Sequence, residues 1–193
     1  MDVINPANNR KIGEVQEFTE EMVHDTVGTL EKGFAGWSGC SPAARSRILF
    51  KAAEIVRQEK DRLASILTAE QGKPLHEAGN EILGAAAVME FYASIAGTIS
   101  GRTLPRADYG YAFTKKSPLG VCGAIIPWNM PALIMAWKVC PALVSGNTMI
   151  LKTASATPLT NIGMADILFR AGLPRDVLAV ITGSGAVAGV ALA

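Results

Sequence analysis

Apolar residues in the first hundred positions recur every three or four residues, a spacing that predicts helices. Ser41 and Pro42 form a helix start, because a serine hydroxyl caps the first turn and proline is tolerated at the first helical position. Charged residues such as Arg45 fall between the apolar positions. Two more helices are expected, one ending at Gly72 and one from about 74 to 98. The apolar positions of the helix that starts at 42 are Ile48, Leu49, Ala52, Ile55 and Val56.

The pattern changes between residues 101 and 118. Tyr109, Tyr111 and Phe113 alternate with small or polar residues, and such alternation is typical of a strand. The tripeptide Asp108-Tyr109-Gly110 interrupts the segment as a turn would. We therefore expect an extended β-hairpin that protrudes from the helical layer.

Beyond Gly120 the chain alternates between apolar strands and amphipathic helices. The strand centres are about 28 residues apart, which suits parallel strands joined by right-handed crossover helices. The strands are apolar on both faces, as in a sheet covered by helices on both sides. The expected strands are 121–126, 148–151 and 177–182, and the expected helices are 131–144, 158–170 and one opening at 183.

These expectations give an α/β fold in three parts. Residues 1–100 form an N-terminal helical layer, 101–118 the hairpin, and 119–193 a doubly wound, Rossmann-like parallel sheet. Three strands make only an incomplete βαβαβ half, which leaves strand edges unpaired and lacks one side of the usual ligand crevice. We therefore expect this sequence to be part of a longer fold.

Composition excludes several classes of protein. The 193 residues are 49% apolar and 18% charged, which is too apolar for a disordered chain. The net charge is +1 and the densest basic stretch is Lys115 and Lys116, so no nucleic-acid partner is expected. Residues 117–137 carry no charge and are long enough to span a bilayer, but Pro127, Asn129 and Pro131 would break the spanning helix. No membrane association is expected.

The cysteines and histidines give no metal or disulfide pattern. The sequence has three cysteines and two histidines, and an odd number of widely spaced cysteines argues against a disulfide framework. No pair has the spacing of zinc ligands, so no metal is expected. Cys122 and Cys140 fall in apolar segments and are predicted to be inert thiols. A cytoplasmic location is expected, because residues 1–6 lack the features of a signal peptide.

Two candidate site residues follow directly from the strand ends. Residues 127–131 come at the carboxyl end of the first parallel strand, where open α/β sheets bind ligands. The prolines at both ends stiffen this loop, so Asn129 offers an amide that suits an oxyanion; alternatively, it caps the next helix. Lys152 follows the second strand at the same edge. It is either a ligand-binding residue or an ordinary solvated residue at the end of a strand.

Two further sequence features indicate a ligand site less specifically. Gly183, Gly185 and Gly189 follow the third strand, and glycines there let backbone N–H groups approach a phosphate. The spacing is one residue longer than the dinucleotide fingerprint, so a glycine-rich packing turn is the alternative. Lys138 is the only charge between 117 and 151, which indicates either a site role or a surface lysine with a buried stem.

Together these motifs resemble the aldehyde dehydrogenase superfamily over almost the whole chain. The resemblance is most specific in the block from Pro127 to Leu159. The other segments that carry it are Asn5-Pro6, Phe34 with Trp37, residues 68–75 and residues 118–121. It implies NAD(P)-dependent oxidation of an aldehyde to a carboxylic acid, with Asn129 donating to the thiohemiacetal oxyanion. Lys138 matches a lysine described in some members as part of a proton relay.

The same resemblance assigns a nucleotide site for NAD or NADP. The implied contact residues are Ile126, Pro127, Trp128, Asn129, Lys152, Ser155, Gly185 and Gly189. The backbone of the first three would line the nicotinamide ribose, Lys152 and Ser155 would hold the adenosine ribose, and the glycines would pack near adenine and pyrophosphate. Many NAD-preferring members carry Glu where this chain has Ser155, so we expect NADP to be accepted as well. Thr153 stands where the family usually has proline, and it is expected to loosen this turn.

Family members are more than twice as long as this chain. The remaining part carries the cysteine nucleophile and the glutamate base, and none of the three cysteines here matches that nucleophile. We therefore expect the cofactor-binding half, inactive alone, with residues 101–118 resembling the arm that forms homo-oligomers. One alternative is a degenerate, non-catalytic fragment that binds nucleotide or pairs with an intact subunit. Another is an unrelated α/β module for a phosphate ligand.

Overall fold

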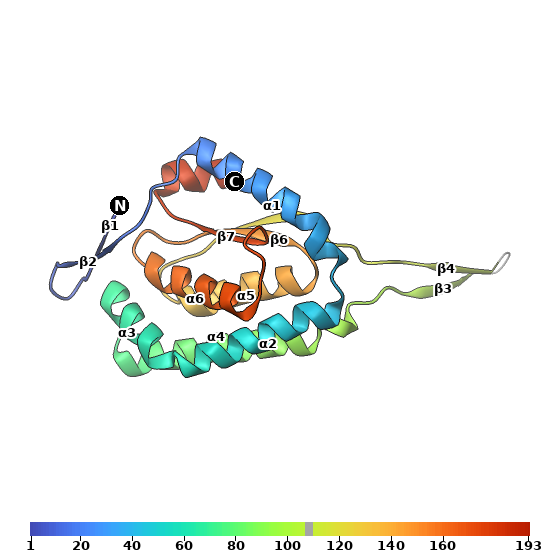
Figure 1. Ribbon diagram of the computed structural model, residues 1–193, viewed down its shortest axis with the longest axis horizontal. Coiled ribbons are helices and arrows are strands. Elements are labelled where there is room, and N and C mark those ends of the chain that lie inside the picture. Colours follow the sequence, from blue (N-terminus) through green and yellow to red (C-terminus); the bar gives the residue numbers. More distant parts are fainter. Residues whose placement is uncertain (107–109) are drawn as a thin grey trace.

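A three-stranded parallel sheet lies at the centre of the computed structural model, which describes residues 1–106 and 110–193 (Figure 1). The strand order is β5-β6-β7, so each strand pairs with the next along the chain. Their bounds are Val121–Ile125 (β5), Thr148–Lys152 (β6) and Leu178–Ile181 (β7). The predicted parallel strands are confirmed to within one residue.

Helices cover both faces of this sheet. Figure 1 shows α5 and α6 beneath the strands, α1 above them, and α2 and α4 in an outer layer below α5 and α6. The helix that covers the opposite face, α1, contacts all three strands. The long helices are Glu20–Gly39 (α1), Pro42–Gln58 (α2), Lys60–Gln71 (α3), Leu75–Ser94 (α4), Pro131–Val144 (α5) and Pro158–Ala171 (α6).

The helix starts and stops follow the predicted signals. Ser41 Oγ accepts a hydrogen bond from the Ala44 backbone N–H at 3.2 Å, and Pro42 occupies the first turn of α2. Gly72 ends α3 with φ 89°, a left-handed conformation that suits glycine. The next helix, α4, is shorter than predicted, because a 3₁₀ turn (η1, Ala96–Thr98) replaces its last residues.

The sequence pattern failed at the N-terminus, where helical structure was expected. Residues 2–14 instead form an antiparallel pair of strands, Asp2–Ile4 (β1) and Lys11–Glu14 (β2). Asn5 Oδ1 accepts the Ala7 N–H at 2.9 Å and Asn9 has φ 56°, so asparagines make the turn between the strands. These strands are too short for a clear alternating pattern.

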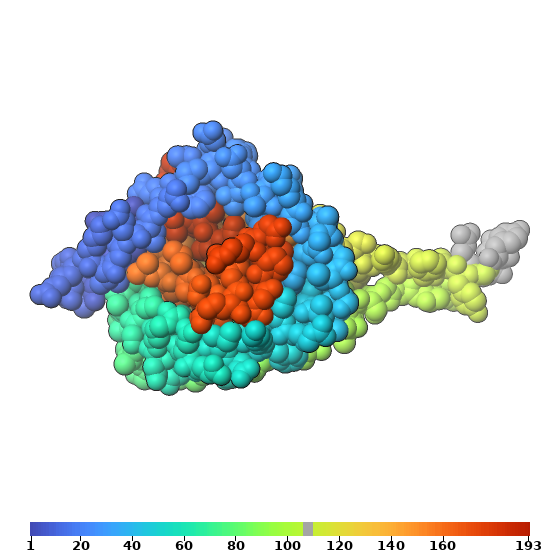
Figure 2. Space-filling view, in the orientation of Figure 1, coloured from blue at the N-terminus to red at the C-terminus, as the bar shows by residue number. Residues whose placement is uncertain are grey.

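The predicted hairpin protrudes from the body of the molecule (Figures 1 and 2). Its strands, Thr103–Arg106 (β3) and Gly110–Phe113 (β4), pair in antiparallel register. Asp108 and Tyr109, to which the pattern assigned the turn and part of the strand, lie outside the described residues. The exposed fractions are 49% for Leu104 and 79% for both Tyr111 and Phe113.

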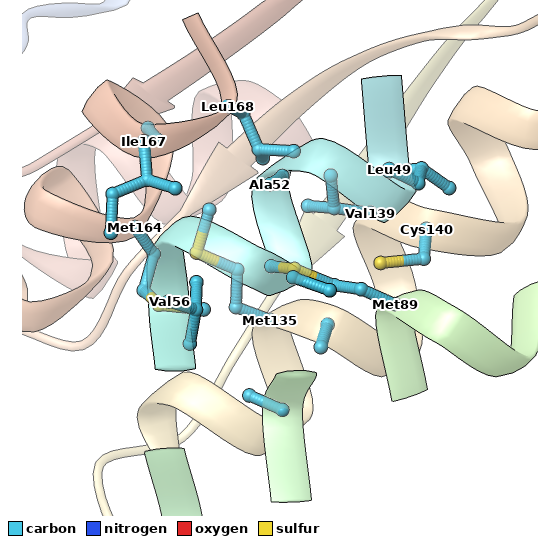
Figure 3. Packing of buried hydrophobic residues seen from close by; sticks show 14 of the residues in the cluster. Leu49, Ala52, Val56, Met89, Met135, Val139, Cys140, Met164, Ile167 and Leu168 are labelled. Atoms are coloured by element: carbon cyan, nitrogen blue, oxygen red, sulfur yellow. The ribbon is translucent and has the colours of Figure 1, made fainter. Parts of the chain in front are cut away.

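The main hydrophobic core lies between the sheet and the two helical layers below it. Figure 3 shows Met89, Met135, Met164 and Cys140 packed among aliphatic side chains of α2, α5 and α6. Every residue of β6 is buried, as predicted for a strand covered on both faces. The edge strand β5 departs from that prediction, because 54% of its last residue, Ile125, is exposed.

A charged side chain that the pattern placed on the polar side of α2 is in fact buried. Arg45 is only 8% exposed, and its Nε donates to the Val144 carbonyl at 3.0 Å. Trp37 Nε1 donates to the preceding carbonyl, that of Leu143, at 3.1 Å. Both groups therefore satisfy carbonyls at the carboxyl end of α5, where a cation also suits the helix dipole.

Candidate functional site

The carboxyl ends of the three parallel strands meet in one row. Ile125, Lys152 and Ile181 are in register across the sheet. Just beyond them, the Ile126 N–H donates to the Lys152 carbonyl and the Thr153 N–H donates to the Ile181 carbonyl, each at 3.1 Å. The segments that leave the strands therefore emerge side by side, at the edge where open α/β sheets bind ligands.

The loop after β5 is exposed, but its backbone is anchored. Trp128 is 59% exposed and Asn129 is also exposed. Gln71 Nε2 donates to the carbonyls of Trp128 and Asn129, at 3.0 and 2.7 Å, and Lys73 Nζ donates to the Asn129 carbonyl at 3.1 Å. Met130, not Asn129, is the N-cap of α5. Within the described ranges, the Asn129 side-chain amide has no hydrogen-bond partner.

A buried glutamate from another helix caps α5 instead. Glu81, on α4, is 4% exposed, and its Oε1 accepts the N–H groups of Ala132 and Leu133 at 2.8 and 3.3 Å. Its other oxygen forms an ion pair with Lys73. A carboxylate is favourable here, because the first N–H groups of a helix lack partners within the helix.

The end of β6 and the turn after it contain the two residues assigned to a ribose. Lys152 is 5% exposed, and burial lowers the pKa of its ammonium group. Over residues 1–106 and 110–193, no hydrogen bond or ion pair engages that ammonium. Ser155 is exposed, and its Oγ donates to the Gly183 carbonyl at 3.0 Å, which joins this turn to the one after β7. Trp128 and Ser155 line one hollow of about 410 Å³.

Thr153 was expected to loosen its turn, but in the structure its hydrogen bonds stabilise the turn. It is fully buried, and its Oγ1 donates to Asn161 Oδ1 at 2.7 Å. Asn161 Nδ2 in turn donates to the Pro131 carbonyl at 2.9 Å. Because proline has neither a hydroxyl nor a backbone N–H, it would lose this bond and the one to Ile181.

The remaining candidates lie in different surroundings. Lys138 is exposed on α5, about two helical turns beyond Pro131. Gly185 is exposed and Gly189 is buried, and both belong to a π-helical turn, Gly185–Gly189 (η2). This turn and the three residues Val190–Leu192 (α7) replace the longer helix that was expected after Gly183.

The three cysteines lie away from this edge. Burial raises the pKa of the Cys140 thiol to about 12, and it also raises the pKa of Cys122. Cys40 caps α1, and its Sγ donates to the Gly36 carbonyl at 3.4 Å. In the part of the chain that the structure describes, no group of three or more histidine, cysteine or acidic residues is arranged to hold a metal, and no helix is long and apolar enough to cross a membrane.

Comparison with known proteins identifies the family of this fold. The model of the aldehyde dehydrogenase family matches residues 1–193. The chain belongs to the aldehyde dehydrogenase family.

Individual proteins and solved structures match this chain over almost its whole length. An aldehyde dehydrogenase of Aspergillus niger is 40% identical over 192 residues, which are 99% of this chain and 39% of that protein. The crystal structure of an NADP-dependent enzyme of E. coli is 37% identical with a TM-score of 0.95, over 97% of this chain and 39% of the other. PnpE of Pseudomonas sp. WBC-3, in complex with NAD, is 28% identical with a TM-score of 0.97, over all of this chain and 40% of the other. The chain thus spans about two fifths of the length of these relatives.

Residues 68–75 carried the family resemblance, but the sequence assigned no role to their side chains. In the structure Glu70 accepts the N–H groups of Leu159 and Thr160, at 2.7 and 2.9 Å, and so caps α6 as Glu81 caps α5. Burial is the main cause that raises the pKa of Glu70. The available signal was an acidic residue among helical apolar positions, but its partner lies 89 residues away along the chain.

Proposed function

We propose that this chain is the nicotinamide-dinucleotide-binding portion of an enzyme that oxidises an aldehyde to a carboxylic acid. The observation that carries the proposal is the convergence at one sheet edge of the anchored Trp128–Asn129 loop, the buried Lys152 and the exposed Ser155. The E. coli relative is NADP-dependent and PnpE was crystallised with NAD, which supports either dinucleotide as the cofactor.

The residues at this edge fit such a group. Lys152 has a mostly buried side chain whose ammonium has no partner in the described ranges, and a ribose hydroxyl would supply one. Ser155 offers a second hydroxyl on the adjoining turn. The backbone of Ile126, Pro127 and Trp128 would line the nicotinamide ribose, and Gly185 and Gly189 would lie near the adenine and pyrophosphate. When bound, the dinucleotide supplies the nicotinamide ring that accepts the hydride.

Asn129 and Lys138 are the proposed catalytic contributions of this chain. The free side-chain amide of Asn129 would donate a hydrogen bond to the oxygen that becomes negatively charged when the aldehyde is attacked. Such a donor is typically worth about 10²–10³ in rate. Lys138, exposed further along α5, would take part in proton transfer with solvent.

The test separates binding from turnover in the 193-residue chain. We expect calorimetric titration with NAD⁺ to give a 1:1 complex, and we expect no aldehyde-dependent formation of NADH, because none of the three cysteines lies at the proposed site to act as a nucleophile. A full-length family member, assayed alongside, confirms that the assay detects NADH. Absence of NAD⁺ binding would overturn the proposed site, and NADH production would overturn the proposed division of roles.

We propose further that the β3–β4 hairpin pairs with another copy of the chain or with an intact subunit. A two-stranded ribbon is marginally stable by itself, and this one exposes Tyr111 and Phe113 almost fully. Light scattering should give a dimer or larger assembly for the wild type and a monomer for the Y111S/F113S double variant. The control is Phe91→Ser, which removes an exposed aromatic from α4 and should leave the assembly unchanged. A wild-type monomer that also fails to bind a full-length relative would refute this pairing.

A further inference from the structure

We propose that Gln71, Lys73 and Glu81 are positioning residues that fix the Asn129 loop for its ligand. The inference rests on the proposed function, because it gives the loop a task that requires a fixed geometry. None of the three was singled out by its residue type or spacing. They come from the end of α3, the turn after it, and the middle of α4.

The first step concerns what holds the loop in place. Pro127, Trp128 and Asn129 are all exposed, so packing alone does not fix this segment. Two successive carbonyls, those of Trp128 and Asn129, accept three hydrogen bonds from Gln71 and Lys73. Fixing two successive peptide groups fixes the backbone from which the Asn129 amide projects. A hydrogen-bond donor for a developing oxyanion must be preorganised in this way to act.

The second step connects the loop to α5. Glu81 uses one oxygen to cap the Ala132 and Leu133 N–H groups and the other to hold Lys73. The same ammonium reaches the Asn129 carbonyl. One buried carboxylate therefore sets the position of the helix start and of the loop that precedes it. Loss of the Lys73 charge would leave Glu81 buried without its counter-ion, so both contacts would weaken together.

The molecule contains a matched control for this arrangement. Glu70 caps α6 with two backbone N–H groups, as Glu81 caps α5, and it is equally buried. In the described ranges it makes no hydrogen bond to residues 127–130. Glu70→Gln should therefore leave the Asn129 loop unchanged, whereas Glu81→Gln removes the carboxylate that pairs with Lys73 and should loosen it.

The experiment measures order of the loop and affinity for two probes, NAD⁺ and AMP, in the full 193-residue chain. In Gln71→Met and Lys73→Met, ¹⁵N relaxation should show the order parameter of the Asn129 backbone amide falling from about 0.85 toward 0.6 or below. The Kd of NAD⁺ should rise about tenfold, because the competent loop would be populated about one tenth of the time. The Kd of AMP, which lacks the nicotinamide half, should change less than about twofold. Lys73→Arg should restore both readouts.

The outcomes separate this inference from the proposed function. Order parameters that stay at the wild-type value in Gln71→Met and Lys73→Met would overturn the positioning role. Equal changes in Glu70→Gln would also overturn it, since they would mean general loosening. If wild-type chain binds no NAD⁺, the proposed function fails while the relaxation comparison still decides whether these residues hold the loop.

Discussion

Replacing Lys152 by methionine is expected to stabilise the chain and at the same time to weaken its binding of nicotinamide dinucleotides. Lys152 is 5% exposed, and the described residues give its ammonium no counter-ion. Burial of an unpaired cation costs free energy, whereas methionine fills a similar volume without charge. Because the ammonium keeps some contact with solvent, we expect the free energy of unfolding to rise by no more than about 1 kcal/mol, measured by urea denaturation.

The pH dependence of stability provides a second signature of the same residue. Burial lowers the pKa of Lys152 below 10.5, so the folded state binds this proton less tightly than the unfolded state does. Between the folded pKa and 10.5 the unfolded chain therefore carries more protons, and wild-type stability contains a contribution that rises with pH. Below the folded pKa the full cost of the buried charge applies. In Lys152→Met this contribution is absent. The difference in free energy of unfolding between the variant and wild type should therefore shrink as the pH rises through that window.

Nucleotide affinity should change in the opposite direction from stability. A hydrogen bond from a charged donor to a ribose hydroxyl contributes about 1.5–3 kcal/mol, so the Kd of NAD⁺ should rise roughly 10- to 100-fold. Lys51→Met, at an exposed position of α2, is the matched control and should alter neither quantity. A Lys152→Met chain that is less stable than wild type would show that the ammonium has a favourable partner in the folded state. An unchanged Kd would remove Lys152 from the nucleotide site.

The parts of the fold that the sequence predicted are those with strong local signals. The bounds of α5 were predicted to the residue, because proline begins the helix, a glycine follows its end and the apolar positions repeat between them. The strand β6 was equally clear as a short apolar run between two helices. The β1–β2 pair gave no such signal, because three or four residues are too few to show alternation.

Buried charges could not be predicted, because their partners are distant in sequence. Arg45 contacts a carbonyl 99 residues away, and Glu81 caps a helix that begins 50 residues further on. In a local pattern, a charge between apolar residues indicates a solvated face. Only the packing of α2 and α4 against α5 converts these charges into helix caps.

The location of the candidate site could be predicted from the sequence, but the contacts that hold its residues in position could not. Residues that follow parallel strands must meet at one edge, so Asn129 and Lys152 followed from the strand ends, whereas Ser155 came from the family resemblance. The side chains that fix the loops at this edge come from the helical layer, or, like Thr153, depart from the residue usual in the family. Their contribution depends on hydrogen bonds that no spacing rule specifies.

Replacing Ser155 by glutamate is expected to convert a chain that accepts both dinucleotides into one that rejects NADP⁺. Ser155 is exposed and its hydroxyl donates to the Gly183 carbonyl, so the position lies on the surface between the turns that follow β6 and β7. A carboxylate there would lie beside the 2′-phosphate of NADP⁺. Two like charges about 4 Å apart near a surface repel by roughly 4 kcal/mol before salt screening. At physiological ionic strength we expect the Kd of NADP⁺ to rise about 100-fold while that of NAD⁺ changes little.

The variant Ser155→Gln, which matches Ser155→Glu in size but carries no charge, separates the effect of charge from the effect of side-chain volume. It also loses the serine hydroxyl, so any effect of the lost bond to Gly183 is common to both variants. Calorimetric titrations with NAD⁺ and NADP⁺ at low and high salt should show that only Ser155→Glu discriminates, and that its discrimination weakens as salt screens the repulsion. If wild type already prefers NAD⁺ strongly, or if the glutamine variant discriminates as well as the glutamate variant, Ser155 does not set the choice of cofactor by charge.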